Sequence, residues 1–194
     1  MGAVIFGEIW VGSNHVMFVL GWRVRMIYNS LLSEMVDMSI VDSISDGDMT
    51  EFHKEVLDAG WCAEANGAWV LQRFREDYSG IVSKFSDVTG YEAAVNGRSI
   101  PDFDIEEGEF LAESLFRRAY SFARRALLDL GEIPGSPPAV AYVSISPALY
   151  DESIITGHVT FCAAREEERP YIEEVSGFTL SGILLLSSSD FHTD

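Results

Sequence analysis

Cysteine, lysine and long apolar runs are scarce in this 194-residue chain. The two cysteines, Cys62 and Cys162, lie far apart in mostly apolar surroundings, which predicts two reduced thiols rather than a disulfide framework. The longest charge-free run, residues 9–22, has 14 residues and is too short for a membrane span of about 20 residues. No lysine or arginine precedes the apolar N-terminal stretch, as a secretory signal would require. We therefore expect a cytoplasmic protein.

Sequence motifs that carry catalytic chemistry are also missing. The chain contains no glycine-rich phosphate-binding loop, no G-x-S-x-G nucleophile elbow, no H-E-x-x-H and no C-x-x-C pair. Nucleotide binding, serine hydrolysis and zinc chemistry therefore lack their usual signatures. We expect a protein that is not an enzyme and that needs no metal or cofactor.

Acidic residues dominate the charge of the chain. Its 31 aspartates and glutamates outnumber 13 lysines and arginines, for a formal net charge of −18. Such a charge repels phosphate backbones and anionic membranes, so neither nucleic acid nor membrane is an expected partner. A macromolecular partner should be a basic or neutral protein. The sequence does not indicate the oligomeric state.

Apolar residues make up 47% of the chain and aromatic residues 12%, which is enough for the core of a single compact domain over residues 1–194. A proline- and glycine-rich connector at residues 131–138 marks a candidate sub-boundary. Periodicity and turn residues predict an α+β fold. It should comprise an N-terminal β-hairpin, short helices with a second hairpin, a long amphipathic helix and a C-terminal antiparallel β-meander.

The expected strands cover residues 4–11 and 15–22 for the first hairpin, 61–65 and 68–74 around Asn66-Gly67 for the second, and 139–146, 154–163 and 175–186 for the meander. The expected helices cover residues 24–38, 48–60, 76–88 and 107–130. Residues 90–101 are interpreted as a loop. For residues 68–88, a single helix starting at Ala68 is the alternative to a hairpin followed by a helix.

The acidic residues gather in three segments, with a net charge of −8 over residues 34–64, −6 over 102–113 and −5 over 165–194. Such patches can steer a basic partner through charge complementarity, while apolar neighbours supply affinity. The candidate contacts are Asp42, Asp46, Asp48, Glu51, Asp102, Asp104, Glu106 and Glu107. The alternative is acid that only keeps the surface soluble. The leading hypothesis is a non-catalytic protein-binding protein, such as an immunity or inhibitor protein that neutralises a basic toxin or nuclease.

Two other charged patterns have simpler explanations than a ligand site. Asp102, Asp104 and Glu113 echo a calcium-binding loop, but Gly108 falls one position late, and carboxylates near a helix N-terminus also favour the helix dipole. The long helix carries four arginines at a seven-residue recurrence, which could bind an anion: Arg117, Arg118, Arg124 and Arg125. Glu113 precedes the first of them by four residues, so pairing with the protein's own carboxylates is the favoured interpretation.

The strand at residues 154–163 supports a different function. Its apolar residues alternate with Thr156, His158, Thr160 and Cys162, which share one face. This face could line a small-molecule site or, in a hydrolase-like enzyme, present His158 as a general base. The hypothesis predicts a concave, partly apolar pocket beside His158. A solvated face is the simpler interpretation.

The order of two helices and an Asn-Gly hairpin over residues 24–74 resembles, in topology alone, the helix-turn-helix and wing of winged-helix domains. The net charge of −8 over residues 34–64 would repel DNA, so a wing of this kind would meet protein. An acidic winged-helix-like regulator is therefore the third hypothesis.

Overall fold

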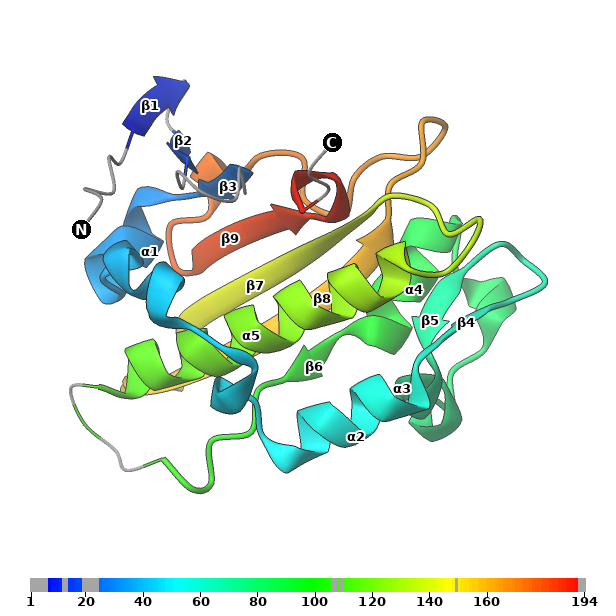
Figure 1. The fold of residues 1–194 in the computed structure, drawn as a ribbon, viewed down its shortest axis with the longest axis horizontal. Coiled ribbons are helices and arrows are strands. Elements are labelled where there is room, and N and C mark those ends of the chain that lie inside the picture. The colour runs from blue at the N-terminus through cyan, green and yellow to red at the C-terminus, as the bar shows by residue number, and fades with distance from the viewer. Residues whose placement is uncertain are drawn as a thin grey trace.

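A computed structural model describes residues 7–11, 14–18, 25–105, 108, 110–148 and 150–191; for residues 7–11, 14–18, 25, 152 and 153 it describes the backbone alone. These residues form a seven-stranded antiparallel sheet with one long helix, α5, lying along a face of it (Figure 1). A separate two-stranded sheet and the shorter helices α2, α3 and α4 gather at one end. The predicted α+β fold is confirmed.

The strands are β1 (Gly7–Val11), β2 (Asn14–Phe18), β3 (Arg25–Tyr28), β4 (Trp61–Ala63), β5 (Trp69–Leu71), β6 (Arg98–Ser99), β7 (Ala139–Ala148), β8 (Asp151–Ala163) and β9 (Gly182–Ser187). In the large sheet they follow the order β1-β2-β3-β9-β7-β8-β6, and β4 pairs with β5. The α-helices are α1 (Ser30–Met35), α2 (Glu51–Ala59), α3 (Gln72–Asp77), α4 (Val88–Asn96) and α5 (Leu111–Gly131). Short 3-10 helices cover Met38–Ser43, Asp46–Asp48, Val82–Lys84, Val175–Gly177 and Ser188–Asp190.

The core lies between α5 and the inner face of the sheet. Helix α5 buries a wide apolar stripe that includes Leu115, Phe122 and Leu130. On β7 and β8, alternate residues such as Val143 and Phe161 face this stripe and are fully buried. Burial of each large apolar side chain contributes about 1.5–3 kcal/mol. The sheet therefore has one face fixed by α5, and the other face is free for polar side chains.

The three C-terminal strands are antiparallel, as predicted, but their order differs from that of a meander. β9 pairs with β7 on the side away from β8, so β7 lies between the other two strands. The segment between β8 and β9, residues 164–181, consequently crosses from one side of β7 to the other. We call residues 164–181 the strap.

Several local predictions are confirmed. β1 and β2 pair as the N-terminal hairpin, and β4 and β5 pair around Asn66-Gly67, where Gly67 has a φ of 84°. Helix α2 ends at Gly60, which has a φ of 76°. Its N-cap is Thr50, and one turn earlier the Asp48 carboxylate closes a capping box with Ser45.

The predicted helix over residues 24–38 is wrong in its first half. Residues 25–28 form β3, where Ile27 pairs with Leu185 of β9. Buried apolar side chains at Met26 and Tyr28 alternate with the intermediate Ile27, which is the period of a strand. Helix α1 begins only at Ser30, because the side chain of Asn29 caps it by accepting from Leu32 N.

The predicted helix over residues 76–88 and the loop over residues 90–101 are also wrong. Helix α3 starts directly after β5 and ends at Asp77, and a new helix, α4, covers Val88–Asn96. The Asp87 side chain caps α4 by accepting from Gly90 N, and a Cβ at Gly90 would lie only 2.9 Å from Asp87 Oδ1, which favours a glycine there. Asn96, at the end of α4, does not form a turn. Its buried side-chain amide accepts from Leu71 N and donates to the carbonyl oxygens of Trp69 and Phe161.

A buried ion pair ties the small sheet to the large one. Glu92 on α4 is fully buried and accepts from Trp69 N at 2.6 Å and from Ala163 N at 2.7 Å. Its two oxygens also receive the Arg165 guanidinium, at 2.5 and 2.9 Å. This pair fixes the point where β8 ends and the strap begins. Most of the buried apolar residues between Met26 and Phe191 form one core cluster; the single domain and the sub-boundary at 131–138 stay predictions.

Candidate functional site

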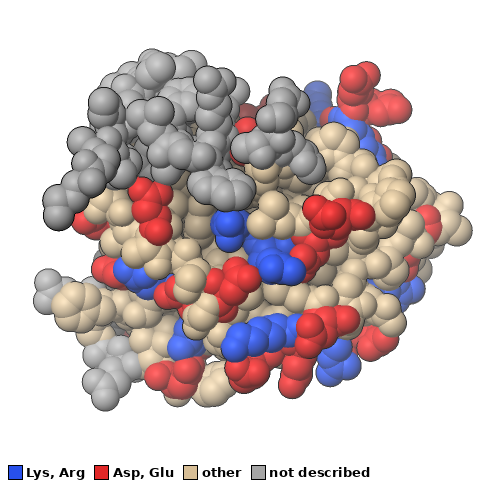
Figure 2. Space-filling view, in the orientation of Figure 1, with Lys and Arg blue, Asp and Glu red and all other residues tan. Residues whose placement is uncertain are grey.

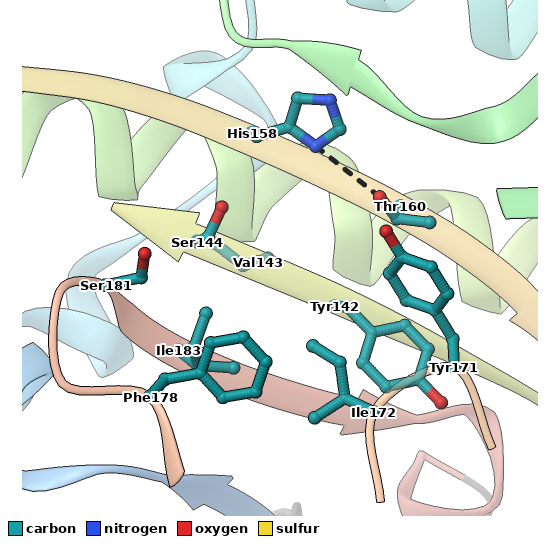
Figure 3. Close-up of a pocket in the computed structure, with 10 residues that line it drawn as sticks. All are labelled: Tyr142, Val143, Ser144, His158, Thr160, Tyr171, Ile172, Phe178, Ser181 and Ile183. Carbon is teal, nitrogen blue, oxygen red and sulfur yellow. Dashed lines mark hydrogen bonds between the residues drawn. The ribbon is translucent and has the colours of Figure 1, made fainter. Parts of the chain in front are cut away.

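The outer face of the large sheet carries a pocket between β7, β8, β9 and the strap (Figure 3). Its volume is about 160 Å³. The side chains with hydrogen-bonding groups that line it are Tyr142, Ser144, His158, Thr160, Tyr171 and Ser181. The apolar lining residues are Val143, Ile172, Phe178 and Ile183. The pocket is therefore concave and partly apolar, with several polar groups converging on it, as the His158 hypothesis predicts.

Strand register builds the floor of the pocket. Ser144 on β7 lies opposite His158 on β8 and opposite Ile183 on β9. Tyr142, two residues earlier, lies opposite Thr160. Because successive side chains alternate between faces, these five residues share the face that points away from α5 (Figure 3). The floor is thus set by paired backbone and not by a loop.

His158 is half-buried, and its Nδ1 lies 3.4 Å from the Thr160 hydroxyl. Burial, together with the nearby Arg98 charge, lowers the pKa of His158 below its usual value. The imidazole is therefore neutral at pH 7, with one nitrogen as donor and the other as acceptor. Gly97 packs against this ring, and a Cβ there would lie 3.2 Å from His158 Cε1 and 2.6 Å from the carbonyl oxygen of Ala93.

Thr160 and Thr156 have different surroundings although both lie on the predicted polar face of β8. Thr160 is buried in the pocket, whereas Thr156 is exposed and donates to Ser146 O at 3.2 Å, outside the pocket lining. The pocket therefore brings together two of the four residues that the sequence placed on this face, His158 and Thr160, while Cys162 donates to Thr89 O outside the lining.

The strap forms the outer wall of the pocket and is held at both ends. Near its start, Glu168 accepts from the backbone amides of Val88 and Thr89 and from the Thr89 hydroxyl, which caps α4. Near its end, the buried Asn29 amide donates to Phe178 O at 3.1 Å and to Ser181 O at 2.8 Å. Both anchors lie outside the pocket and position its wall.

Aromatic rings from the strap and the floor meet over the pocket. Tyr142 and Tyr171 have ring centroids 5.4 Å apart at an angle of 70°. Burial raises the pKa of Tyr142 to about 12, so its hydroxyl stays protonated. Sequence reasoning missed the strap: the predicted strand over residues 175–186 is wrong in its first part, because Val175–Gly177 form a 3-10 helix and β9 begins only at Gly182. The residues on β7 had a usable signal, since Tyr142 and Ser144 interrupt its apolar run at alternate positions.

The proposed acidic contact residues are largely paired within the protein. Asp46 lies 3.4 Å from Arg125, Asp48 lies 3.7 Å from Arg117, Asp104 binds Arg118 at 2.7 Å, and Glu51 binds Lys54 at 2.6 Å. Asp42 and Asp102 are exposed, and Glu106 and Glu107 lie outside the described residues. On the face that α5 occupies, Figure 2 shows basic and acidic side chains interspersed. Carboxylates of the protein itself thus pair with the arginines of α5, as predicted.

The echo of a calcium loop gains no support. Asp104 binds Arg118 through both of its oxygens, each at 2.7 Å, and Glu113 pairs with Arg117 at 3.0 Å. Within the described ranges, no cluster of three or more histidines, cysteines or carboxylates could hold a metal ion. Cys62 and Cys162 are free thiols, as predicted. Among the residues that the structure describes, no helix combines the length and apolarity needed to cross a bilayer.

Comparisons of the chain with protein-family models, curated proteins and solved structures found no match. Function must therefore be inferred from the chemistry of the site itself.

Proposed function

We propose that this protein binds a small molecule in the pocket on the outer face of β7, β8 and β9. The observation that carries the proposal is the convergence of hydroxyl groups, a neutral imidazole and aromatic rings on one cavity. A volume of about 160 Å³ compares with an engineered cavity of about 150 Å³ that holds benzene, so the occupant is about the size of one six-membered ring.

The lining favours recognition over catalysis. Hydroxyls of Ser144, Thr160 and Ser181 can each donate and accept a hydrogen bond, and His158 adds a further polar group. The described part of the chain places no carboxylate and no cysteine in the pocket lining, so none of these residues gives His158 an acidic partner there to orient it as a general base. The polar groups would fix the orientation of a ligand that the aromatic wall holds by contact.

A matched pair of threonines on one strand tests this proposal. A screen of single-ring and similarly small compounds, observed by NMR, supplies the hits. Thr160→Val removes a hydroxyl from the pocket without changing the side-chain shape, and we expect it to weaken a hit by about 3- to 10-fold. Thr156→Val makes the same change on the same strand outside the pocket and should leave binding unchanged. Equal effects of both variants, or no hit that perturbs pocket resonances, would refute the proposal.

Binding of a basic protein is our second proposal, and one observation favours it. Phe103 is 89% exposed between Asp102 and Asp104, and aromatic residues are enriched at protein interfaces. Because four of the six described candidate carboxylates already pair with the protein's own cations, we place this function second. A co-purifying basic protein that is lost in Phe103→Ser would support it. The immunity, inhibitor and winged-helix forms of this idea stay predictions.

A further inference from the structure

The rim of the pocket exposes aromatic surface. Tyr171 is 50% exposed and Phe178 is 40% exposed, although both line the pocket. Figure 3 shows Tyr142, Tyr171 and Thr160 on one side of the pocket, and Phe178, Ser181 and Ser144 on the other. An exposed ring at the edge of a cavity offers its negative face to whatever enters. Each side therefore combines an aromatic ring with a hydroxyl group.

The strap wall of the pocket carries an excess of acidic side chains. Among the residues that the structure describes, neither lysine nor arginine lines the pocket. The strap that forms its wall carries five glutamates and two arginines, and Glu173 and Glu174 directly follow the lining residue Ile172. Both of these glutamates are exposed. The net charge of −18 adds a long-range attraction for cations.

Two arginines in the surroundings of the pocket, Arg98 and Arg165, are engaged elsewhere. Arg98, whose charge acts on His158, donates to Gly97 O and Phe74 O, and its guanidinium lies 4.7 Å from the centroid of the Phe74 ring. Arg165, at the start of the strap, is bound by Glu92 and donates to Gly67 O. An anion in the pocket would therefore meet no free cation from these two residues and would be repelled by the strap.

We infer, on the basis of the proposed function, that the ligand of this pocket is a small alkylated ammonium ion. Its methyl-bearing head would contact the faces of Tyr171 and Phe178, where a cation gains from the ring quadrupole. Its polar end would reach the hydroxyls of Ser144 and Ser181. Alkyl groups on nitrogen remove N–H donors, so such a head prefers ring faces to hydroxyl oxygens. The volume of the pocket accepts a head group with a short arm.

The test compares a cation with its neutral isostere on the wild-type protein. Choline is the probe, and the dimethylbutanol in which carbon replaces the choline nitrogen is the neutral match. Titrations followed by amide NMR should give a choline affinity at least about fivefold higher than that of the isostere, with shifts at pocket residues and weakening in high salt. Phe178→Leu should reduce this preference. Tyr150→Leu, at an aromatic residue 85% exposed and not part of the pocket lining, should preserve it.

The outcomes separate this inference from the proposed function. If the isostere or another neutral compound binds the pocket as tightly as choline, the inference of a cation is overturned and a small-molecule site remains. If neither choline nor any neutral compound of the screen perturbs pocket resonances, both are overturned. The wild-type comparison needs no variant to fold, so the result is decisive even if Phe178→Leu is unstable.

Discussion

Neutralising Glu92 should destabilise the protein more than neutralising any exposed carboxylate. In Glu92→Gln, the side chain keeps its shape but loses its charge, and the new amide NH₂ must face the donors of Trp69, Ala163 or Arg165. The side chain of Arg165 is 17% exposed, so its guanidinium would remain largely buried without a counter-charge. Breaking a buried pair on one side costs about 3–5 kcal/mol. Some outward movement of Arg165 reduces this, and we expect about 3 kcal/mol.

Thermal unfolding followed by circular dichroism measures this cost. For a chain of this size, a loss of about 3 kcal/mol lowers Tm by roughly 6–12 °C. The matched control is Glu51→Gln, where the Glu51 side chain is 83% exposed and pairs only with Lys54 in the same helix. That variant should change the free energy of unfolding by less than about 1 kcal/mol. A double-mutant cycle with Arg165→Gln should show strong coupling, because removing the guanidinium also removes the buried unpaired charge.

If the free energy of unfolding of Glu92→Gln lies within about 1 kcal/mol of that of wild type, this reasoning is refuted, because solvent must then reach the Glu92–Arg165 pair. Additive effects of the Glu92 and Arg165 substitutions would refute it as well. The strap supplies a local readout. Since Arg165 is its second residue, hydrogen exchange should rise at residues 164–168 in Glu92→Gln before it rises in α5.

Two other buried polar groups give predictions of their own. The His53 side chain is 1% exposed, and its ring stacks on that of Phe122 with the centroids 4.4 Å apart. Its Nδ1 has no hydrogen-bond partner among the described residues. Burial, aided by the charge of Arg118, lowers the pKa of His53 to about 4. Because the unfolded chain binds the proton of His53 more tightly, the free energy of unfolding should fall by up to about 3 kcal/mol as pH drops from about 6.5 to 4. Urea unfolding measured across this pH range should show a smaller pH dependence in His53→Phe than in wild type. An unchanged pH dependence would contradict the assignment of this effect to His53. Asn29→Ala removes five hydrogen bonds, three donated to the strap and two accepted from Leu32 N and Ile183 N, and should cost about 2–4 kcal/mol and raise hydrogen exchange at residues 175–181. A loss of stability with unchanged exchange there would refute the role of Asn29 as the anchor of the strap.

The elements that the sequence predicted well are those whose signal is local. The apolar stripe of α5 repeats at helical spacing, and Asn66-Gly67 specifies a tight turn, so neither depends on the rest of the chain. Tertiary pairing overrides local pattern at β3, where Ile27 and Tyr28 fit either a helix or a strand until β9 pairs with them. Helix α4 was predicted as a loop, because Gly90 and the Asn96-Gly97 dipeptide are typical of turns and give a stronger local signal than the helix cap at Asp87.

The candidate site divides in the same way. His158 and Thr160 were found because strand alternation is a local property of β8. The strap could not be predicted, since its position depends on Asn29 and Glu168 making contacts across about 80 to 150 residues of sequence. The pairing of the surface carboxylates also depends on contacts between residues far apart in the sequence. Asp46 and Asp104 look like open carboxylates in the sequence, and only the fold brings Arg125 and Arg118 to them.

The distribution of compensated and uncompensated charge bears on where a ligand can bind. Beside α5, carboxylates and guanidinium groups alternate, so their fields cancel within a few ångströms of the surface (Figure 2). On the strap, Arg165 is consumed by the buried Glu92, and Arg169 lies 3.8 Å from Glu173 as an exposed pair. The exposed Glu166, Glu167 and Glu174 then leave this wall of the pocket negative. This acidic wall is the basis on which we expect the pocket to distinguish a cation from its neutral isostere.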